Sequence, residues 1–346
     1  MGVTDWTIST VDYHTAGEPF RIVPDPPFAI PGATVLERRQ NAATGEADVL
    51  RRLLVNEPRG HADMYGGFIV PPDDGGAHLG VLFCHKDGFS TACGHGTIAL
   101  GAWAVRSGLV PAEPDGVTDV VIDVPSGRVV AKVLMAGGEL LSVTFRNVPS
   151  YVAAREIAVD TPGFGTVSVD VLWGGALYAS LRASDVGLRV RGADLNALID
   201  AGRQVKAALA GQPASRHPRD PRLDGIYGTV IFEDVDQGQV PELLGRPGSG
   251  AVAQRNVTIF ADGQVDRSPC GSGTAARVAA LDSSGLLTSG GILDHFSIID
   301  SHFTGMVAQR HPGGVVVDVV GTAYPVGESR FRLDPADRLS LGFVLR

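Results

Sequence analysis

The stretch TACGHGTIAL, residues 91–100, is matched 177 residues later (270 − 93) by SPCGSGTAAR, residues 268–277. Both stretches contain the pattern Cys-Gly-x-Gly-Thr-x-Ala, which opens with Cys93 in the first copy and with Cys270 in the second. The chain of 346 residues holds three cysteines, so two of them stand at the head of one repeated motif. Such self-similarity at a long interval indicates a duplicated structural unit.

Four further pairs of segments align around the two motifs, in the same order along the chain. They are TVDYHTAG near Asp12 with SVDVLWGG near Asp170, MYGGFIV (64–70) with IYGTVIF (226–232), the Asp-Gly pairs at 87–88 and 262–263, and DVPSGRVVA (123–131) with DSHFTGMVA (300–308). The offset between partners grows from 158 to 177, as insertions in a second copy would produce. We therefore predict two pseudo-symmetric α/β halves, residues 1–155 with Cys93 and residues 156–324 with Cys270, and we expect residues 325–346 to pack back on the first half.

Local patterns predict mostly β structure of the α/β (α+β) class. Short apolar or alternating runs bounded by Gly, Pro or Asp, such as HLGVLFC and GGVVVDVVGTAY, are typical of strands. Three segments predict helices: residues 97–107 and 274–283, which follow the two motifs, and residues 194–211, where apolar residues recur at helical spacing. The composition of residues 211–225 predicts a surface loop.

The composition is that of an ordinary globular protein, with 44% hydrophobic and 19% charged residues. A net charge of −9 argues against a nucleic-acid partner, and no apolar run reaches the ~18 residues of a membrane helix, so we expect no membrane partner. The N-terminal MGVTDWTIST lacks the basic and apolar regions of a secretory signal. Three cysteines cannot close a disulfide framework, which favours a reducing cytoplasm as the location.

Each motif places a thiol just before a predicted helix, where unpaired backbone N–H groups and the helix dipole favour negative charge. This position predicts a thiol pKa lowered from about 8.5 toward neutrality, and the same N–H groups suit a carboxylate ligand. The glycines are expected to allow close approach of the backbone and, where needed, positive φ. Two acid/base groups on opposite sides of one ligand could remove a proton and return it from the far side, which inverts a stereocentre. Cys84, in the apolar run LGVLFC, is expected to be a buried core residue instead.

Two other chemistries have weaker support in the sequence. GSGTAA, residues 271–276, partly matches the dinucleotide fingerprint G-x-G-x-x-A, but DRSP rather than a strand precedes the motif. Cys84, His85, Cys93 and His95 are residue types that bind zinc, yet no C-x-x-C occurs and the spacing fits no structural zinc pattern. We therefore expect no metal.

The chain resembles the proline racemase family over nearly its whole length. The resemblance lies in HTAGEPFRIV from His14, EPRGHADMYG from Glu57, ACGHGTIALG from Ala92, WGGALY from Trp173 and VDRSPCGSGTAAR from Val265. It implies two α/β halves of mixed β-sheet wrapped around a central helix, as in diaminopimelate epimerase, with the active site in the cleft between them. It also implies an enzyme that needs no cofactor, in which Cys93 and Cys270 are the two catalytic bases.

The resemblance further assigns residues that bind the substrate. Backbone N–H groups of Gly94 and His95 in one motif, and of Gly271 and Ser272 in the other, would bind the carboxylate of a small cyclic imino acid. Asp266 matches the family residue at the substrate's ring nitrogen, where a carboxylate would pair with a secondary ammonium.

The subgroup within the family stays open. Ser90, three residues before the first cysteine, is typical of the family's trans-3-hydroxy-L-proline dehydratases and is thus a candidate substrate-binding residue, whereas racemases and 4-hydroxyproline epimerases more often have Leu there. Those dehydratases typically carry Thr in place of the second cysteine, while this chain keeps Cys270. We expect a two-cysteine racemase or epimerase acting on proline or hydroxyproline, with 3-hydroxyproline favoured. The alternatives are a trans-3-hydroxy-L-proline dehydratase giving Δ1-pyrroline-2-carboxylate, an enzyme with both activities, and a non-catalytic binder of cyclic amino acids. A homodimer is the candidate assembly.

Overall fold

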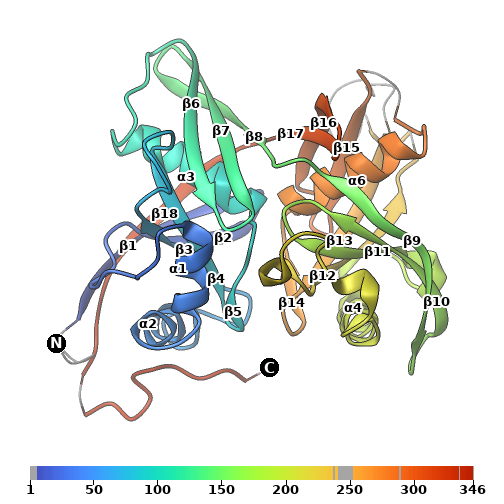
Figure 1. Ribbon diagram of the computed structural model, residues 1–346, viewed down its shortest axis with the longest axis horizontal. Helices are drawn as coiled ribbons and strands as arrows, with labels where there is room; N and C mark the ends of the chain where they lie inside the picture. The colour runs from blue at the N-terminus through green and yellow to red at the C-terminus, as the bar shows by residue number, and fades with distance from the viewer. Residues whose placement is uncertain (1–5, 237, 241–251, 288–289, 335, 346) are drawn as a thin grey trace. The chain divides into compact units, whose positions relative to one another are not determined.

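The computed structural model describes residues 6–236, 238–240, 252–287, 290–334 and 336–345 (Figure 1). The expectation about a signal sequence rests in part on residues 1–5, which lie outside the described residues. The chain divides into two compact units: unit 1, which is Met1–Thr144 with Thr322–Arg346, and unit 2, which is Phe145–Gly321. The division into folding domains at residues 155 and 324 stays a prediction. No described helix has the length and apolar character that a membrane crossing requires.

Unit 1 is a mixed sheet with helices between its strands. Its elements in chain order are β1 (Thr7–Thr15), β2 (Glu18–Val23), α1 (Val35–Ala42), α2 (Glu46–Val55), β3 (Tyr65–Val70), β4 (Leu79–His85), β5 (Gly88–Phe89), α3 (Gly94–Arg106), β6 (Gly116–Val124), β7 (Gly127–Ala136), β8 (Glu139–Arg146, which ends inside unit 2) and β18 (Ala323–Arg332). β4 pairs with β3, β5 and β6, and each of its residues is buried, which explains why LGVLFCH has no polar alternation.

Unit 2 has the same kind of architecture. Its elements are β9 (Tyr151–Thr161), β10 (Gly165–Trp173), β11 (Leu177–Arg182), the 3₁₀ turns η2 (Ala183–Val186) and η3 (Gly192–Asp194), α4 (Leu195–Leu209), the 3₁₀ turns η4 (Pro213–Ser215) and η5 (Pro221–Leu223), β12 (Ile226–Asp234), β13 (Val252–Phe260), β14 (Gln264–Asp266), α6 (Gly271–Ser283), β15 (Ile292–Ser297), β16 (His302–His311) and β17 (Gly314–Gly321). In β17 half-buried and buried residues alternate along GVVVDVVG, as in a strand with one face on a core.

The two units repeat one order of strand pairings. In unit 1, β1 is antiparallel to β18 and β2, β2 is parallel to β3, β3 is antiparallel to β4, and β4 is antiparallel to β5 and parallel to β6. Unit 2 has the same pairings: β10 is antiparallel to β9 and β11, β11 is parallel to β12, β12 is antiparallel to β13, and β13 is antiparallel to β14 and parallel to β15. The five segment pairs found in the sequence fall on equivalent strands, turns and helix starts. The internal duplication and the α/β class are therefore confirmed.

The helix that follows each cysteine motif lies against the sheet of its unit. Within unit 1, α3 packs on β1, β2, β6, β7 and β18, and within unit 2, α6 packs on β9, β10, β16 and β17 (Figure 1). Small residues permit this close approach: a Cβ built on Gly101 of α3 would lie 2.6 Å from the Cβ of Ala131 on β7. The residues Gly94–Ala104 and Gly271–Leu281 are buried along both helices. Each cysteine motif thus starts the central helix of its unit.

The predicted helices exist, with shifted starts. α3 and α6 begin at Gly94 and Gly271, three residues before the predicted starts, and α4 lies within the predicted range 194–211. The predicted loop 211–225 contains the short turns η4 and η5. The prediction missed α1 and α2, although Thr34 caps α1 by accepting a hydrogen bond from the N–H of Glu37 at 3.2 Å.

Candidate active site

The first motif places Cys93 at the N-cap of α3. Its φ of −156° is extended, and its Sγ accepts a hydrogen bond from the Gly96 N–H at 3.2 Å. The first intrahelical bond runs from the Thr97 N–H to the Cys93 carbonyl at 3.0 Å, so the N–H groups of Gly94 and His95 precede it at the positive end of the helix. The thiol is 5% exposed. The sulfur therefore lies at the positive end of the helix and accepts a hydrogen bond from one of its backbone N–H groups.

His95 lies beside this thiol as a neutral ring. Its two ring nitrogens are 3.5 and 3.6 Å from Cys93 Sγ, and the rings of Tyr65 and Phe20 meet it edge-on at centroid distances of 5.0 and 5.8 Å. Burial lowers the pKa of His95 to about 3, so the imidazole is uncharged at neutral pH. The Thr15 hydroxyl donates to the His95 carbonyl at 3.0 Å and fixes this turn of backbone.

Ser90 is joined to the same cluster through a tyrosine. Its Oγ is 2.5 Å from the hydroxyl of Tyr65, whose ring contacts His95, and it also donates to the Ala92 carbonyl at 3.4 Å. The side chains of Ser90, Tyr65 and His95 are all buried. The four candidate residues of unit 1, Ser90, Cys93, Gly94 and His95, thus gather at one helix start.

The second motif places Cys270 at the N-cap of α6 in a different backbone conformation. Its φ is +64°, a region that residues with a Cβ rarely adopt and that stores strain at functional sites. Three contacts hold this conformation: the Cys270 N–H donates to Ser268 Oγ at 3.1 Å, the Thr274 N–H donates to the Cys270 carbonyl at 2.7 Å, and Asn256 Nδ2 donates to the Pro269 carbonyl at 3.1 Å.

Asp266 ends β14 next to this thiol. One of its carboxylate oxygens accepts hydrogen bonds from the N–H and the hydroxyl of Ser268, at 2.8 and 2.7 Å. Burial raises the pKa of Asp266 to about 6, in spite of these bonds. A carboxyl with this pKa is protonated more easily than an ordinary aspartate but is still mostly ionised at about pH 7.

The surroundings of Cys270 favour the protonated thiol over the thiolate. Burial raises its pKa to about 12, the charge of Asp266 acts in the same direction, and the Gly273 N–H and the hydroxyls of Tyr178 and Thr258 oppose the rise. The expectation that both helix starts lower a thiol pKa is therefore wrong for Cys270. Desolvation in an apolar cluster outweighs the helix dipole there.

The fourth residue of each motif, Gly96 or Gly273, makes room for the sulfur. The sequence also suggested that motif glycines adopt positive φ, and these two do not. Neither Gly96 nor Gly273 has a positive φ. A Cβ built on Gly96 would lie 2.8 Å from Cys93 Sγ, and one built on Gly273 would lie 3.0 Å from Cys270 Sγ. Each glycine therefore leaves the space that the thiol of its own motif occupies.

The third cysteine is a core residue, as the sequence predicts. Cys84 lies in β4, is 1% exposed and belongs to the apolar core with Phe68, Leu82 and Phe89. Burial raises the pKa of Cys84 to about 12. Among the residues that the structure describes, no three His, Cys, Asp or Glu side chains cluster as they would around a metal ion.

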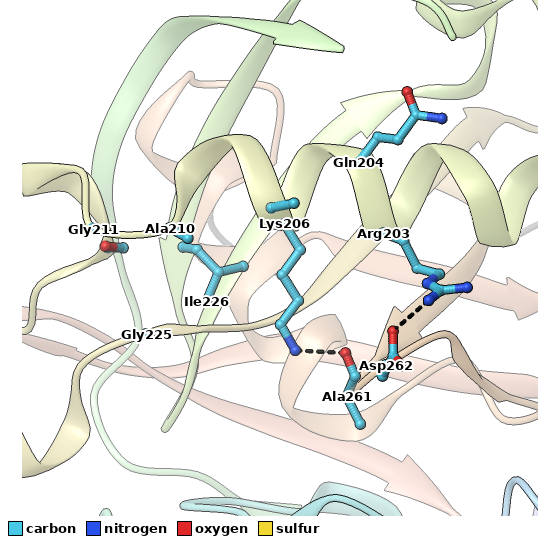
Figure 2. A pocket seen from close by; sticks show the side chains of 11 residues that line it. Arg203, Gln204, Lys206, Ala210, Gly211, Gly225, Ile226, Ala261 and Asp262 are labelled. Atoms are coloured by element: carbon cyan, nitrogen blue, oxygen red, sulfur yellow. Dashed lines mark hydrogen bonds and ion pairs between the residues drawn. The ribbon is translucent and has the colours of Figure 1, made fainter. Parts of the chain in front are cut away.

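A groove of about 610 Å³ lies elsewhere in unit 2, between α4, the start of β12 and the turn after β13 (Figure 2). The cations that line it have partners. Lys206 Nζ donates to the Ala261 carbonyl at 2.6 Å, and Arg203 lies 2.9 Å from Asp262 (Figure 2). Lys206 Nζ also donates to the Tyr227 carbonyl at 3.2 Å. No residue of either cysteine motif lines it. The candidate residues at the start of α6 thus lie outside this groove.

Sequence reasoning missed several side chains that support the motifs. Tyr65 and Tyr178 contact the motif residues His95 and Ser272, and Asn256 holds the carbonyl that precedes Cys270. Tyr178 is the last residue of the segment WGGALY, and the duplication aligns it with Phe20 of the first copy. This alignment could have indicated that Tyr178 lies near the second motif. The contact made by Asn256 carries no signal in the sequence, because it joins segments that are separate in the chain.

Comparison with known proteins gives a consistent result. The proline racemase family model matches residues 10–344. The chain is 41% identical over 345 residues to a 3-hydroxyproline 2-epimerase of Burkholderia multivorans and to a trans-3-hydroxy-L-proline dehydratase of Burkholderia cenocepacia, covering 98% of each chain in both comparisons. The structure is similar to that of a hydroxyproline epimerase from Agrobacterium vitis with bound trans-4-hydroxy-L-proline, with a TM-score of 0.88, 27% identity and coverage of 100% of this chain and 96% of that one. The duplicated topology, the two cysteine-capped helices and these similarities together show that the chain belongs to the proline racemase family.

Proposed function

We propose that this protein is a cofactor-independent racemase or epimerase that inverts Cα of proline or hydroxyproline, with 3-hydroxyproline favoured. One observation carries the proposal: equivalent helices of two duplicated units both start with a cysteine, Cys93 and Cys270. A non-catalytic binder would gain nothing from a matched pair of acid/base groups. The relative named 3-hydroxyproline 2-epimerase supports the choice of substrate.

The proposed reaction moves one proton off Cα and another onto it. Cys93, as thiolate, takes the Cα proton, and the electron pair is delocalised into the substrate carboxylate. Cys270, which burial holds as a thiol, donates its proton to the opposite face of Cα. The product has inverted Cα, and the two sulfurs have exchanged roles. The proposal requires both thiols to reach the same carbon from opposite faces.

The substrate's charged groups have assigned partners in this proposal. The carboxylate would bind the backbone N–H groups of Gly94 and His95 and of Gly271 and Ser272, since helix N-termini favour anions. The ring ammonium would pair with Asp266, and its positive charge would lower the pKa of that carboxyl and keep it ionised. The neutral ring of His95 adds no charge that would compete with the ammonium.

A second candidate function is dehydration of trans-3-hydroxy-L-proline. Ser90 favours it, and so does a relative named for this activity at the same identity as the epimerase. In that reaction the thiolate takes the Cα proton, the C3–O bond breaks, and the hydroxyl leaves as water after taking a proton from the enzyme. The resulting enamine tautomerises to Δ1-pyrroline-2-carboxylate, and one base suffices.

The deciding experiment is incubation with L-proline, trans-4-hydroxy-L-proline and trans-3-hydroxy-L-proline in D₂O, followed by ¹H NMR. Deuterium at Cα together with the inverted isomer supports the epimerase. Signals of Δ1-pyrroline-2-carboxylate support the dehydratase instead. Absence of both, with binding still measurable by calorimetry, would leave only the binder.

We also propose a cytoplasmic location, because all three cysteines are free thiols. A homodimer is the assembly we propose, and light scattering of the purified protein tests it.

A further inference from the structure

Tyr178 lies on β11 with its hydroxyl between two residues of the second motif. Its hydroxyl is 2.7 Å from Ser272 Oγ and 3.8 Å from Cys270 Sγ. The ring is fully buried in an apolar cluster that also contains Leu172 and Val230. A buried phenol hydroxyl usually has hydrogen-bond partners, and the partners of Tyr178 are motif residues.

A hydroxyl at this point can serve both protonation states of the thiol, since it donates one hydrogen bond and accepts others. With Cys270 protonated, the S–H donates to Tyr178 and the Tyr178 O–H donates to Ser272. With Cys270 ionised, the Tyr178 O–H turns to the sulfur. The change needs only rotation of the hydroxyl proton, so the packed ring stays in place.

The first motif has no tyrosine hydroxyl at the position equivalent to Tyr178. The offset of 158 that aligns Asp12 with Asp170 also aligns Phe20 with Tyr178, and a phenylalanine has no hydroxyl to offer. Phe20 lies edge-on to His95, the residue that stands where the second motif has Ser272. The two thiols therefore sit in one topology with different neighbours.

We propose that Tyr178 is a positioning residue for Cys270, which it links to Ser272 and whose thiolate it stabilises when the proton leaves. This role rests on the proposed function of Cys270 as an acid/base group. The other groups that face Cys270 are the Asp266 carboxyl on β14, the Thr258 hydroxyl on β13 and the Gly273 N–H of α6. They are unchanged in the test variants.

The test compares Tyr178→Phe with the wild type by iodoacetamide alkylation of the full-length protein without ligand, read for each cysteine by peptide mass spectrometry across a pH series. Loss of one hydrogen bond to the thiolate should slow alkylation of Cys270 about tenfold at the same pH, while Cys93 keeps its rate. With substrate, kcat should fall by about the same factor and KM should stay close to its wild-type value.

Tyr151→Phe is the matched control. Tyr151 lies in the same unit, and its hydroxyl is buried without a hydrogen-bond partner among the described residues, so its removal should change neither alkylation nor kcat. Wild-type alkylation of Cys270 in Tyr178→Phe, or an equal loss in Tyr151→Phe, would overturn the role of Tyr178.

Ser272→Ala tests the same bridge from its other end and remains informative if Tyr178→Phe does not fold. The Tyr178 hydroxyl would then have Cys270 as its acceptor, so alkylation of Cys270 should become faster, and a slower or unchanged rate would contradict the proposal. Alkylation needs no substrate. If the wild type shows no turnover, the proposed function is wrong. The role of Tyr178 is tested separately, by the alkylation rates of Cys270.

Discussion

The two motif cysteines differ at the level of single contacts. Cys93 accepts a hydrogen bond from the Gly96 N–H and has a neutral His95 beside it, whereas Cys270 faces the carboxyl of Asp266. A nearby carboxylate and a dry environment both oppose loss of a proton. The proposed reaction, in which one thiol takes a proton and the other donates one, would use such a difference.

Alkylation of the wild type should follow this difference. Burial raises the pKa of both Cys270 and Cys84 to about 12, whereas Cys93 Sγ accepts a hydrogen bond from the Gly96 N–H at the start of α3. Cys93 should therefore react with iodoacetamide first, by roughly tenfold or more, and a bound carboxylate such as the substrate should protect it. Peptide mapping of partly modified protein measures the order. Equal rates at the three cysteines, without protection, would contradict an activated thiol at Cys93.

Asp266→Asn should stabilise the protein near neutral pH while it removes activity. The folded pKa of about 6 exceeds the usual 3.8, so the folded state binds more protons between these values and stability falls as pH rises through this window. Ionisation of Asp266 thus lowers the free energy of unfolding at about pH 7 by up to ~3 kcal/mol, and an Asn side chain, which does not ionise, avoids this loss. Thermal unfolding at about pH 7 should show a higher midpoint for the variant, with the advantage lost near pH 4. A wild type more stable than the variant at pH 7 would rule this out.

For single residues, the sequence predicted those properties that depend on one short segment of the chain. The burial of Cys84 follows from the apolar strand around it, and the grouping of Ser90, Cys93 and His95 follows from their closeness in the chain. The state of Cys270 does not follow, because burial, the carboxyl of Asp266 and the Tyr178 hydroxyl come from separate elements.

At the scale of elements, the helix starts matter most. The sequence predicted both motif helices but began them at Thr97 and Thr274, since glycine is a poor helix former and a periodic pattern first becomes visible after it. In the structure the helices start at Gly94 and Gly271, directly after a cysteine at each N-cap position, and a small residue faces each sulfur. Of the two cysteines, Cys93 also accepts a side-chain capping hydrogen bond, from the Gly96 N–H. Tertiary packing thus overrides local preference.

Gly96→Ala should impair the first motif specifically. Its Cβ would lie 2.8 Å from Cys93 Sγ and 2.5 Å from the Phe20 ring, so the sulfur must move, and kcat should fall by ~100-fold or more. Gly101→Ala in the same helix is the control: its Cβ meets Ala131 at 2.6 Å, which should lower the unfolding midpoint without changing kcat of the folded enzyme. Equal kcat losses in both variants would mean that general destabilisation is the cause.

At the scale of the whole molecule, the duplication was the strongest basis for prediction. Five aligned segment pairs predicted two copies of one topology, and the strand pairings repeat in that order. The helices α1 and α2 of the first copy and α4 of the second fill the same place in the order with different lengths, so their details could not be inferred from the repeat.

Substitution of the second cysteine separates the two candidate reactions. If inversion needs two bases, Cys270→Ser should lose racemisation or epimerisation by ~10²–10⁴-fold in kcat, because a serine hydroxyl is too weak an acid to supply a resting base. If dehydration is the activity, Cys270→Thr should keep elimination from trans-3-hydroxy-L-proline. Polarimetry and product NMR measure both, with Cys84→Ala as the control. Near wild-type inversion by Cys270→Ser would refute the two-thiol mechanism.

The pairing of β1 with β18, from Thr7 opposite Arg332 to Thr15 opposite Ala323, has a consequence for synthesis on the ribosome. A strand translated near the start of the chain must wait for one translated after all of unit 2. At about 5–20 residues per second, the intervening 307 residues (323 − 15 − 1) take roughly 15–60 s to emerge. During that time β1 has an open edge that chaperones or other nascent chains can bind, and unit 2 is synthesised up to its last strand, β17, which ends at Gly321. The last strand of unit 2 is therefore translated just before β18, the strand that completes the sheet of unit 1.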